Sequence, residues 1–139
     1  MKRFIWDGTC SVGVESIDEQ HRYFFEIANK ILDLAEKETI AREDVLILLG
    51  ELGDYAFYHL GTEEKYFGEF GYEDAPAHIA AHNEYRKTVE HYLEETKGEK
   101  ADAKKLAVEM ASYSGEWLMR HIMVMDKKYT AVFHSHGLK

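Results

Sequence analysis

Apolar side chains recur at intervals of three and four residues along most of the chain, the spacing of helices that bury one face. The first such stretch predicts a helix over residues 17–37, and Ser16 with Glu19 has the spacing of a capping box at its start. The inward face of this helix is formed by His21, Phe24, Phe25, Ala28, Ile31, Leu32 and Ala35.

Three more helices follow from the same pattern. One is predicted from Ala41 to about Gly68, with an inward face of Val45, Leu48, Leu49, Leu52 and Ala56 that continues in phase through His59, Glu63 and Phe67. The next begins after Asp74, a candidate N-cap, and has Pro76 in its first turn, where a missing N–H costs least. It runs to about Thr96, with inward residues His78, His82, Tyr85, Val89 and Leu93. The last helix is marked by Leu106, Met110, Trp117, Leu118, His121, Ile122 and Met125.

The two ends of the chain lack a sustained period. Residues 1–16 predict an extended arm laid over the core with Trp6 as its anchor, and residues 129–139 predict a short tail. Residues 17–128 then form four helices of roughly 20 residues joined by short turns, with no strand pattern. This predicts an all-α fold, an up-down-up-down antiparallel four-helix bundle with an extended N-terminal arm, and residues 1–139 are expected to be a single domain.

The composition limits which classes of partner the protein can bind and which cellular compartment is expected. The formal net charge of −9 disfavours nucleic acid and anionic lipid, because both are bound by an excess of Lys and Arg. Cys10 is the only cysteine, so no disulfide forms within the chain, and the first residues lack the apolar stretch of a secretory signal. No apolar run approaches the roughly 20 residues of a membrane helix. We therefore expect a cytoplasmic protein that does not insert into a membrane.

Metal-capable side chains lie on the inward face of every predicted helix. The spacings His59-x-x-x-Glu63 and His78-x-x-x-His82 each stack two such side chains on one face, because four helical residues advance roughly 400°. His21 and His121 extend the set to the other two helices. A single buried histidine needs only a hydrogen-bond partner, but five histidines with Glu63 would be costly to bury unless a metal bound them.

The other three histidines fall outside the inward faces, and Asp126 fits the helical spacing less simply. His91 lies half a turn from His82 and is expected to face solvent, while His134 and His136 lie in the predicted tail. Asp126 is five residues after His121, roughly 140° out of phase in a regular helix. It can face the cluster if the helix widens locally, as in a π-bulge, or if the cluster is broad; otherwise it is a solvated residue near a helix end.

The types of donor atom limit which metal ions can bind and how many are expected. Nitrogen and oxygen donors without thiolate suit iron, manganese or zinc and exclude an iron–sulfur cluster. Zinc usually takes four ligands, and seven candidates are too many for one such ion, so two ions are expected. The Glu-x-x-His pairs of dioxygen-activating bundles are absent, and the set is rich in histidine.

The chain resembles the hemerythrin family over nearly its full length, and within it the free-standing bacteriohemerythrins. The motifs that carry this resemblance are Trp6, Ser11-Val12-Gly13-Val14, Ile17-Asp18-Glu19-Gln20-His21, His59-x-x-x-Glu63, Gly71-Tyr72, His78-x-x-x-His82 and Trp117-Leu118-x-x-His121-Ile122-x-x-x-Asp126. The resemblance implies a non-haem di-iron centre bridged by Glu63, Asp126 and an oxo or hydroxo group. It also implies reversible binding of dioxygen. Because the Glu-x-x-His pairs are missing, we expect no enzymatic activity.

Within that implied centre, His78 and His82 share one helix face and are expected to serve one iron together with His121. His21 and His59 then serve the other, which reaches only five ligands and keeps an open position for dioxygen. The expected walls of the dioxygen pocket are Phe24, Phe25, Leu60, Trp117, Leu118 and Ile122. Leu60, Phe67, Tyr85 and Glu73 stand where the family often has other residues, and none of these differences removes a ligand.

The resemblance leaves three roles to compare. The first is dioxygen storage, delivery or buffering. The second is an oxygen or redox sensor, which would need a protein partner that the sequence does not identify. The third is a di-iron oxidase or peroxidase, which the missing Glu-x-x-His pairs disfavour. We expect the first.

Overall fold

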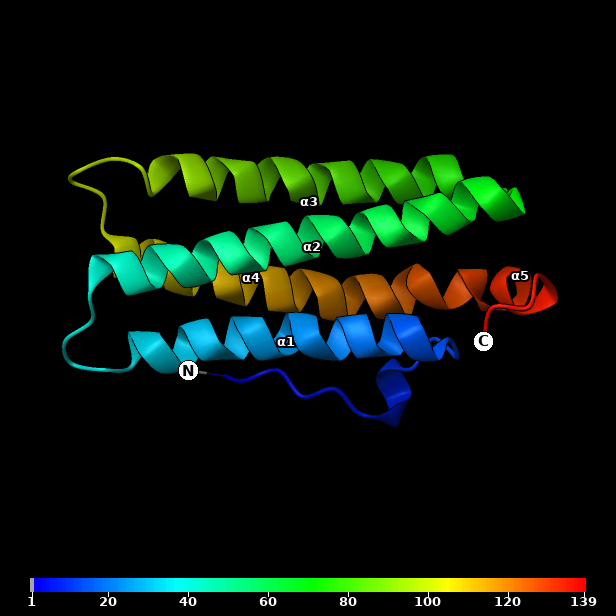
Figure 1. Cartoon of the computed structure of the whole chain (residues 1–139), viewed down its shortest axis with the longest axis horizontal. Coiled ribbons are helices and arrows are strands. Elements are labelled where there is room, and N and C mark those ends of the chain that lie inside the picture. Colours follow the sequence, from blue (N-terminus) through cyan, green and yellow to red (C-terminus); the bar gives the residue numbers. More distant parts are fainter. Residues whose placement is uncertain (1) are drawn as a thin grey trace.

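The computed structural model describes residues 2–139, and its architecture is a bundle of four long helices (Figure 1). These are α1 (Glu15–Ala35), α2 (Arg42–Phe70), α3 (Ala75–Glu95) and α4 (Ala103–Val124). Successive helices run in opposite directions, with α1 packed on α2 and α4, and α3 packed on the same two helices. No strand occurs in residues 2–139, so the predicted all-α antiparallel bundle is confirmed.

Two helix ends differ from the sequence prediction. The capping box is wrong, because Val14 is the N-cap of α1 and no side chain caps that end. Asp18 instead accepts hydrogen bonds from the Val12 N–H at 2.9 Å and the Ser11 hydroxyl at 2.6 Å, which holds the preceding segment against the first turn. Helix α2 continues past Gly68 and ends at Gly71, whose φ of 61° is left-handed and favours glycine.

The end of α2 leads directly into α3, and here the prediction held. Asp74 is the N-cap of α3 and Pro76 lies in its first turn, although the Asp74 side chain makes no capping hydrogen bond. The turn between the two helices is therefore short, and it keeps the histidines of α3 beside those of α2.

The predicted C-terminal tail is wrong. After α4 the chain forms a short 3-10 helix, η2 (Asp126–Tyr129), and a further helix, α5 (Thr130–Ser135), at one end of the bundle (Figure 1). Tyr129 and Phe133 are fully buried, and their rings stack with centroids 4.1 Å apart. This helix is too short for a repeat of apolar residues to be recognised in the sequence, but burial of the two aromatic rings stabilises the segment.

The N-terminal arm lies along the bundle, as predicted, but Phe4 is its most deeply seated aromatic residue. The Phe4 ring occupies the space where a side chain at Gly115 of α4 would sit, and its backbone exchanges two hydrogen bonds with the Asn29 amide, at 2.9 and 2.8 Å. Trp6, the expected anchor, is half-buried. The Arg22 guanidinium lies over its ring, with the guanidinium carbon 4.1 Å from the ring centroid.

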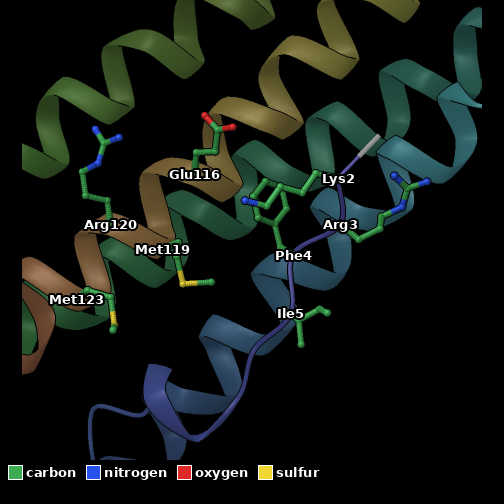
Figure 2. Close-up of a pocket in the computed structure, with 8 residues that line it drawn as sticks. All are labelled: Lys2, Arg3, Phe4, Ile5, Glu116, Met119, Arg120 and Met123. Atoms are coloured by element: carbon green, nitrogen blue, oxygen red, sulfur yellow. The ribbon is translucent and has the colours of Figure 1, made fainter.

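A surface groove separates this arm from α4, as Figure 2 shows. Its walls include Lys2 and Ile5 on the arm, and Glu116 and Met123 on α4. None of the predicted metal ligands lines it. Within the described residues, no helix is long and apolar enough to cross a membrane.

Candidate metal centre

All seven predicted ligands meet in the interior of the bundle. His21 comes from α1, His59 and Glu63 from α2, His78 and His82 from α3, His121 from α4 and Asp126 from the start of η2. Each of these residues is buried, with His121 the most exposed at 5%. The inward periodicity of each helix is what directs these polar side chains to a common point.

The seven side chains form two groups that share both carboxylates. Glu63 and Asp126 join His78, His82 and His121 in one group and His21 with His59 in the other, and within each group the donor atoms lie within 4.8 Å of one another. Each carboxylate therefore lies between the two groups of histidines.

Asp126 contacts both groups through its two oxygens. Its Oδ1 lies 2.9 Å from both His78 Nε2 and His121 Nε2, and its Oδ2 lies 3.1 Å from His21 Nε2. Glu63 uses one oxygen for both groups, with Oε1 at 3.4 Å from His59 Nε2 and from His82 Nε2.

The backbone brings Asp126 to the cluster by ending α4, and not by the π-bulge that was one of the alternatives considered. The last α-helical hydrogen bond of α4 is donated by the Met125 N–H to the His121 carbonyl at 2.8 Å. Met125 has φ −115° and ψ −52°, and the chain then tightens into η2. This change of pitch corrects the phase difference between His121 and Asp126, and Asp126 is fully buried.

Several buried polar atoms in the cluster have no hydrogen-bond partner, which tests whether a metal fits. The atoms concerned are both ring nitrogens of His21, His59 Nε2, Glu63 Oε1 and Asp126 Oδ2. The His21–Asp126 pair is close, but its geometry is not that of a hydrogen bond. Buried donors and acceptors left unpaired cost free energy, and cations bound at these atoms would compensate for that cost.

The three histidines of the larger group point the same ring atom at one another. His121 Nε2 lies 2.9 Å from His78 Nε2 and 3.1 Å from His82 Nε2. Three nitrogens that converge in this way, with a carboxylate oxygen beside them, are the donor set of a first-row transition metal.

Residues outside the seven hold two of the rings in orientation. His59 Nδ1 lies 2.7 Å from Gln20 Oε1, and His82 Nδ1 lies 2.7 Å from Glu64 Oε2. Both partners accept hydrogen bonds, so Nδ1 carries a proton in each ring and Nε2 is the nitrogen that faces the cluster. Arg86 in turn donates to both oxygens of Glu64, at 2.7 and 3.0 Å.

The helical pattern of the sequence did not point to these orienting residues. Gln20 and Glu64 each adjoin a ligand in the sequence, and that adjacency is the signal that could have found them. Arg86 offered no comparable signal.

The protonation states follow from burial and from these contacts. Burial lowers the pKa of His59 to about 4, so this ring is neutral near neutral pH. Burial alone would raise the pKa of Asp126, but His121, His21 and His78 together hold it well below its ordinary value. Burial would also lower the pKa of His82, but Glu63 and Glu64 raise it to about 9, so a metal at His82 would displace a proton.

Tyr129 is a further buried group that the sequence did not reveal. Its hydroxyl donates to Glu63 Oε2 at 2.5 Å, and burial raises its pKa well above the ordinary value. Tyr129 lies beyond residue 128, the predicted end of the bundle, so the helical pattern did not point to it.

The predicted pocket residues divide into three sets. Leu60, Leu118 and Ile122 are fully buried in the core. Phe24 and Trp117 contact ligand rings, with Trp117 stacked 4.3 Å from His121 and Phe24 set edge-on 6.5 Å from His59.

Phe25 stacks on Phe4 at 5.8 Å, on the side of the N-terminal arm. Phe67, which was not assigned to the pocket, lies 4.7 Å from the ring of His78. A shallow hollow lined by Trp117, His121 and Met125 connects the surface to a ligand.

The three histidines assigned elsewhere do lie outside the cluster. His91 is exposed and pairs with Glu95 at 2.6 Å. His134 Nε2 lies 2.7 Å from the Gly13 carbonyl, and His136 stacks on Phe70 at 4.5 Å.

A four-helix bundle with a buried cluster of histidines and shared carboxylates defines a class of metal-binding bundle protein. The family model for the hemerythrin HHE cation binding domain matches residues 12–133. The chain therefore belongs to the hemerythrin family.

Individual relatives cover most of the chain. A bacteriohemerythrin of Clostridium acetobutylicum is 31% identical over 128 residues, which span 91% of this chain and 98% of that protein. One of Stenotrophomonas maltophilia is 29% identical over 137 residues, 98% of this chain and 85% of that protein. A crystal structure of wild-type hemerythrin is 26% identical and superposes with a TM-score of 0.83, covering 92% of this chain and 95% of that one.

Proposed function

We propose that this protein binds dioxygen reversibly at a non-haem di-iron centre and serves dioxygen storage, delivery or buffering. The observation that carries the proposal is the pair of histidine groups that share Glu63 and Asp126 in a buried, incompletely hydrogen-bonded cluster. Membership of the hemerythrin family, and relatives named bacteriohemerythrin, support the same function.

We propose the same division of ligands that the sequence suggested. His78, His82 and His121 would hold one iron, His21 and His59 the other, and the two carboxylates would bridge them together with an oxo or hydroxo group. Bound in this way, the two irons supply electrons to dioxygen. The protein side chains supply the orientation of the donors and keep bulk water from the site.

The surroundings favour binding and release over breaking the O–O bond. Leu60, Leu118 and Ile122 are fully buried apolar residues, so the core around the histidines offers few groups that could donate a proton. The Tyr129 hydroxyl is already committed to Glu63 at 2.5 Å. Without a free general acid, cleavage of dioxygen lacks the proton that it needs, so we propose a carrier and not an enzyme.

The visible spectrum tests the proposal. The protein is loaded with iron, reduced, exposed to air and then degassed. We expect a new absorption band on exposure and recovery of the starting spectrum on degassing. Stopped-flow mixing should show one fast binding phase. Steady consumption of dioxygen with oxidation of an added co-substrate over many turnovers would instead identify an oxidase.

A further inference from the structure

A continuous row of oxidisable rings leads from the candidate metal centre along the interface of α3 and α4. Trp117 stacks on the ligand His121 with centroids 4.3 Å apart and planes 14° apart. Tyr85 stacks on Trp117 at 4.4 Å and on Tyr113 at 5.8 Å, and Tyr113 lies 6.4 Å from Tyr92.

The helical repeat places these rings in register. Trp117 and Tyr113 are four residues apart on α4, and Tyr85 and Tyr92 are seven apart on α3, so each pair shares one helix face. The rings alternate between the two helices along the row. Tyr85 is fully buried in the middle, and Tyr113 and Tyr92 are half-buried at the outer end.

Every ring in this row can lose one electron, because indole and phenol are oxidised far more readily than phenylalanine. On the other side of the centre, phenylalanine rings interrupt the contacts, since Tyr129 stacks on Phe133 and also lies beside Phe67. The competing path there is from Tyr129 to Tyr72, whose rings are 6.5 Å apart and set edge to face.

An oxidised tyrosine persists as a neutral radical only where its phenolic proton can be lost, so the surroundings of each hydroxyl decide which tyrosine is finally oxidised. The Tyr85 hydroxyl donates to the Ser114 hydroxyl at 2.8 Å, and serine is too weak a base to take the phenolic proton. Tyr85 therefore relays the oxidising equivalent to the next ring and does not remain a stable radical. Tyr92 is half-buried at the outer end of the row, near the carboxylates of Glu109 and Glu95, which can accept its phenolic proton once the ring is oxidised. A proton can leave for water there.

We propose that the row from Trp117 to Tyr92 carries oxidising equivalents from the metal centre to the surface when hydrogen peroxide reacts at that centre. The inference rests on the di-iron site proposed above. One hydrogen peroxide takes up two electrons and its weak O–O bond breaks, which gives two hydroxide ions without help from a general acid. Tyr92 and Tyr113 each supply one electron through the row and release one phenolic proton to solvent, and two protons from solvent convert the hydroxide ions to two water molecules. The two tyrosyl radicals then couple to a dityrosine cross-link.

The consequence is protection of the ligands. Oxidising equivalents that stayed at the centre would attack the histidine rings that hold the metal, whereas damage at Tyr92 and Tyr113 leaves the centre intact. The row thus lets the protein remove one hydrogen peroxide by oxidising Tyr92 and Tyr113, in a single event and not as a catalytic cycle.

Peroxide treatment of the iron-loaded protein tests this proposal. We expect a transient tyrosyl signal in electron paramagnetic resonance, and peptide mass spectrometry should find oxygenated or cross-linked Tyr92 and Tyr113. The metal-free protein treated in the same way should show neither. The double variant Tyr92→Phe/Tyr113→Phe should lose both products, with oxidation moving back to Trp117.

Tyr58→Phe is the matched control, because Tyr58 is an exposed tyrosine whose ring contacts among the described residues lead to Tyr55 and Tyr23 and not to the centre. It should behave as the wild type. Oxidation spread over all exposed tyrosines including Tyr58, oxidation confined to Tyr129 and Tyr72, or an unchanged radical signal in the double variant would each overturn the proposal.

Iron content and the dioxygen adduct are measured on the same samples to separate the two proposals. A protein that binds iron and releases dioxygen on degassing, yet shows no ring oxidation, overturns the peroxide route alone. A protein that takes up no iron overturns both.

Discussion

The hydroxyl of Tyr129 donates a 2.5 Å hydrogen bond to Glu63, and both side chains are fully buried. The two residues are 66 positions apart in the sequence. Tyr129 lies in η2, beyond the four long helices, and Glu63 is one of the two carboxylates shared by both histidine groups. The C-terminal segment is therefore part of the candidate metal centre.

Replacing Tyr129 by Phe should destabilise the metal-free protein by about 1–3 kcal/mol, because Glu63 Oε2 would be left buried without a donor. Urea unfolding gives the difference. Tyr23→Phe is the control, since Tyr23 also donates to a carboxylate, Glu51 at 2.9 Å, but at the surface. Its effect should stay within about 0.5 kcal/mol. Equal effects of the two substitutions would show that burial of the bond contributes nothing.

His78→Ala should reduce the iron content well below the two ions per chain expected of the wild type. The His78 ring is buried, and its Nε2 faces both His121 and Asp126 at 2.9 Å. His91→Ala is the matched control, because His91 lies on the same helix but its side chain is 71% exposed. Elemental analysis after growth with added iron measures both. Full iron content in His78→Ala, or loss in His91→Ala, would contradict the assignment.

Leu118→Ala should speed autoxidation of the dioxygen adduct. Leu118 is fully buried one turn before His121, and its truncation leaves a cavity that can admit water beside the centre. The same cavity should cost about 2–5 kcal/mol of stability. Met123→Ala, an exposed position on the same helix, is expected to change neither quantity. An unchanged rate of adduct decay in Leu118→Ala would place the barrier to water elsewhere.

Gly115→Ala should loosen the N-terminal arm, because a Cβ at this position would lie only 2.2 Å from the Phe4 ring. We expect a loss of about 1–3 kcal/mol from this overpacking. Gly61→Ala in α2, where no atom lies within 4 Å of the added carbon, should instead stabilise by about 0.5–1 kcal/mol.

Thermal or urea unfolding measures both glycine substitutions. Adding Phe4→Ala to Gly115→Ala should give a double variant less destabilised than the sum of the single changes, since the clash is then gone. Strict additivity would argue that Phe4 does not occupy the space beside Gly115.

Glu64 should make the metal-free protein sensitive to acid. Burial alone would raise the pKa of Glu64, but hydrogen bonds from His82 and Arg86 lower it from 4.5 to about 2. Because the folded-state value is depressed, this contribution to stability is present above about pH 4.5 and is lost as the pH falls towards about 2.

The measurement compares the wild type with Glu64→Gln by urea unfolding across this range. The difference in unfolding free energy should shrink as the pH falls, because the protonated carboxyl then resembles the amide. A difference that stays constant with pH would show that the charge on Glu64 is not what stabilises the contact.

The ligand-bearing helix faces could be predicted from the sequence because each rests on a short-range repeat. His59 with Glu63, and His78 with His82, lie one turn apart, and the apolar residues around them show which way that face points. Five histidines on four inward faces then have to meet, because a bundle has only one interior. The resemblance to the hemerythrin family rested on the same residues.

The tertiary structure decided what the local repeat does not contain. Asp126 reaches the cluster because α4 stops at Val124 and the chain changes pitch, and a periodic extrapolation through His121 cannot show where a helix stops. Gln20 and Glu64 orient rings on neighbouring helices, which depends on how the helices pack.

The N-terminal arm and α5 differ from the helices for the same reason. The arm and the C-terminal segment formed by η2 and α5 are each too short to show a period, and each is held by contacts with residues far away in the chain, such as Phe4 with Gly115 and Tyr129 of η2 with Glu63. The sequence by itself thus determined the four helices and the residues they turn inward, because 3.6-residue periodicity is a local property. Only the folded chain determined how the N-terminal arm packs on α4 and how the C-terminal segment covers the metal centre, because burial of those residues is a property of the whole packed bundle.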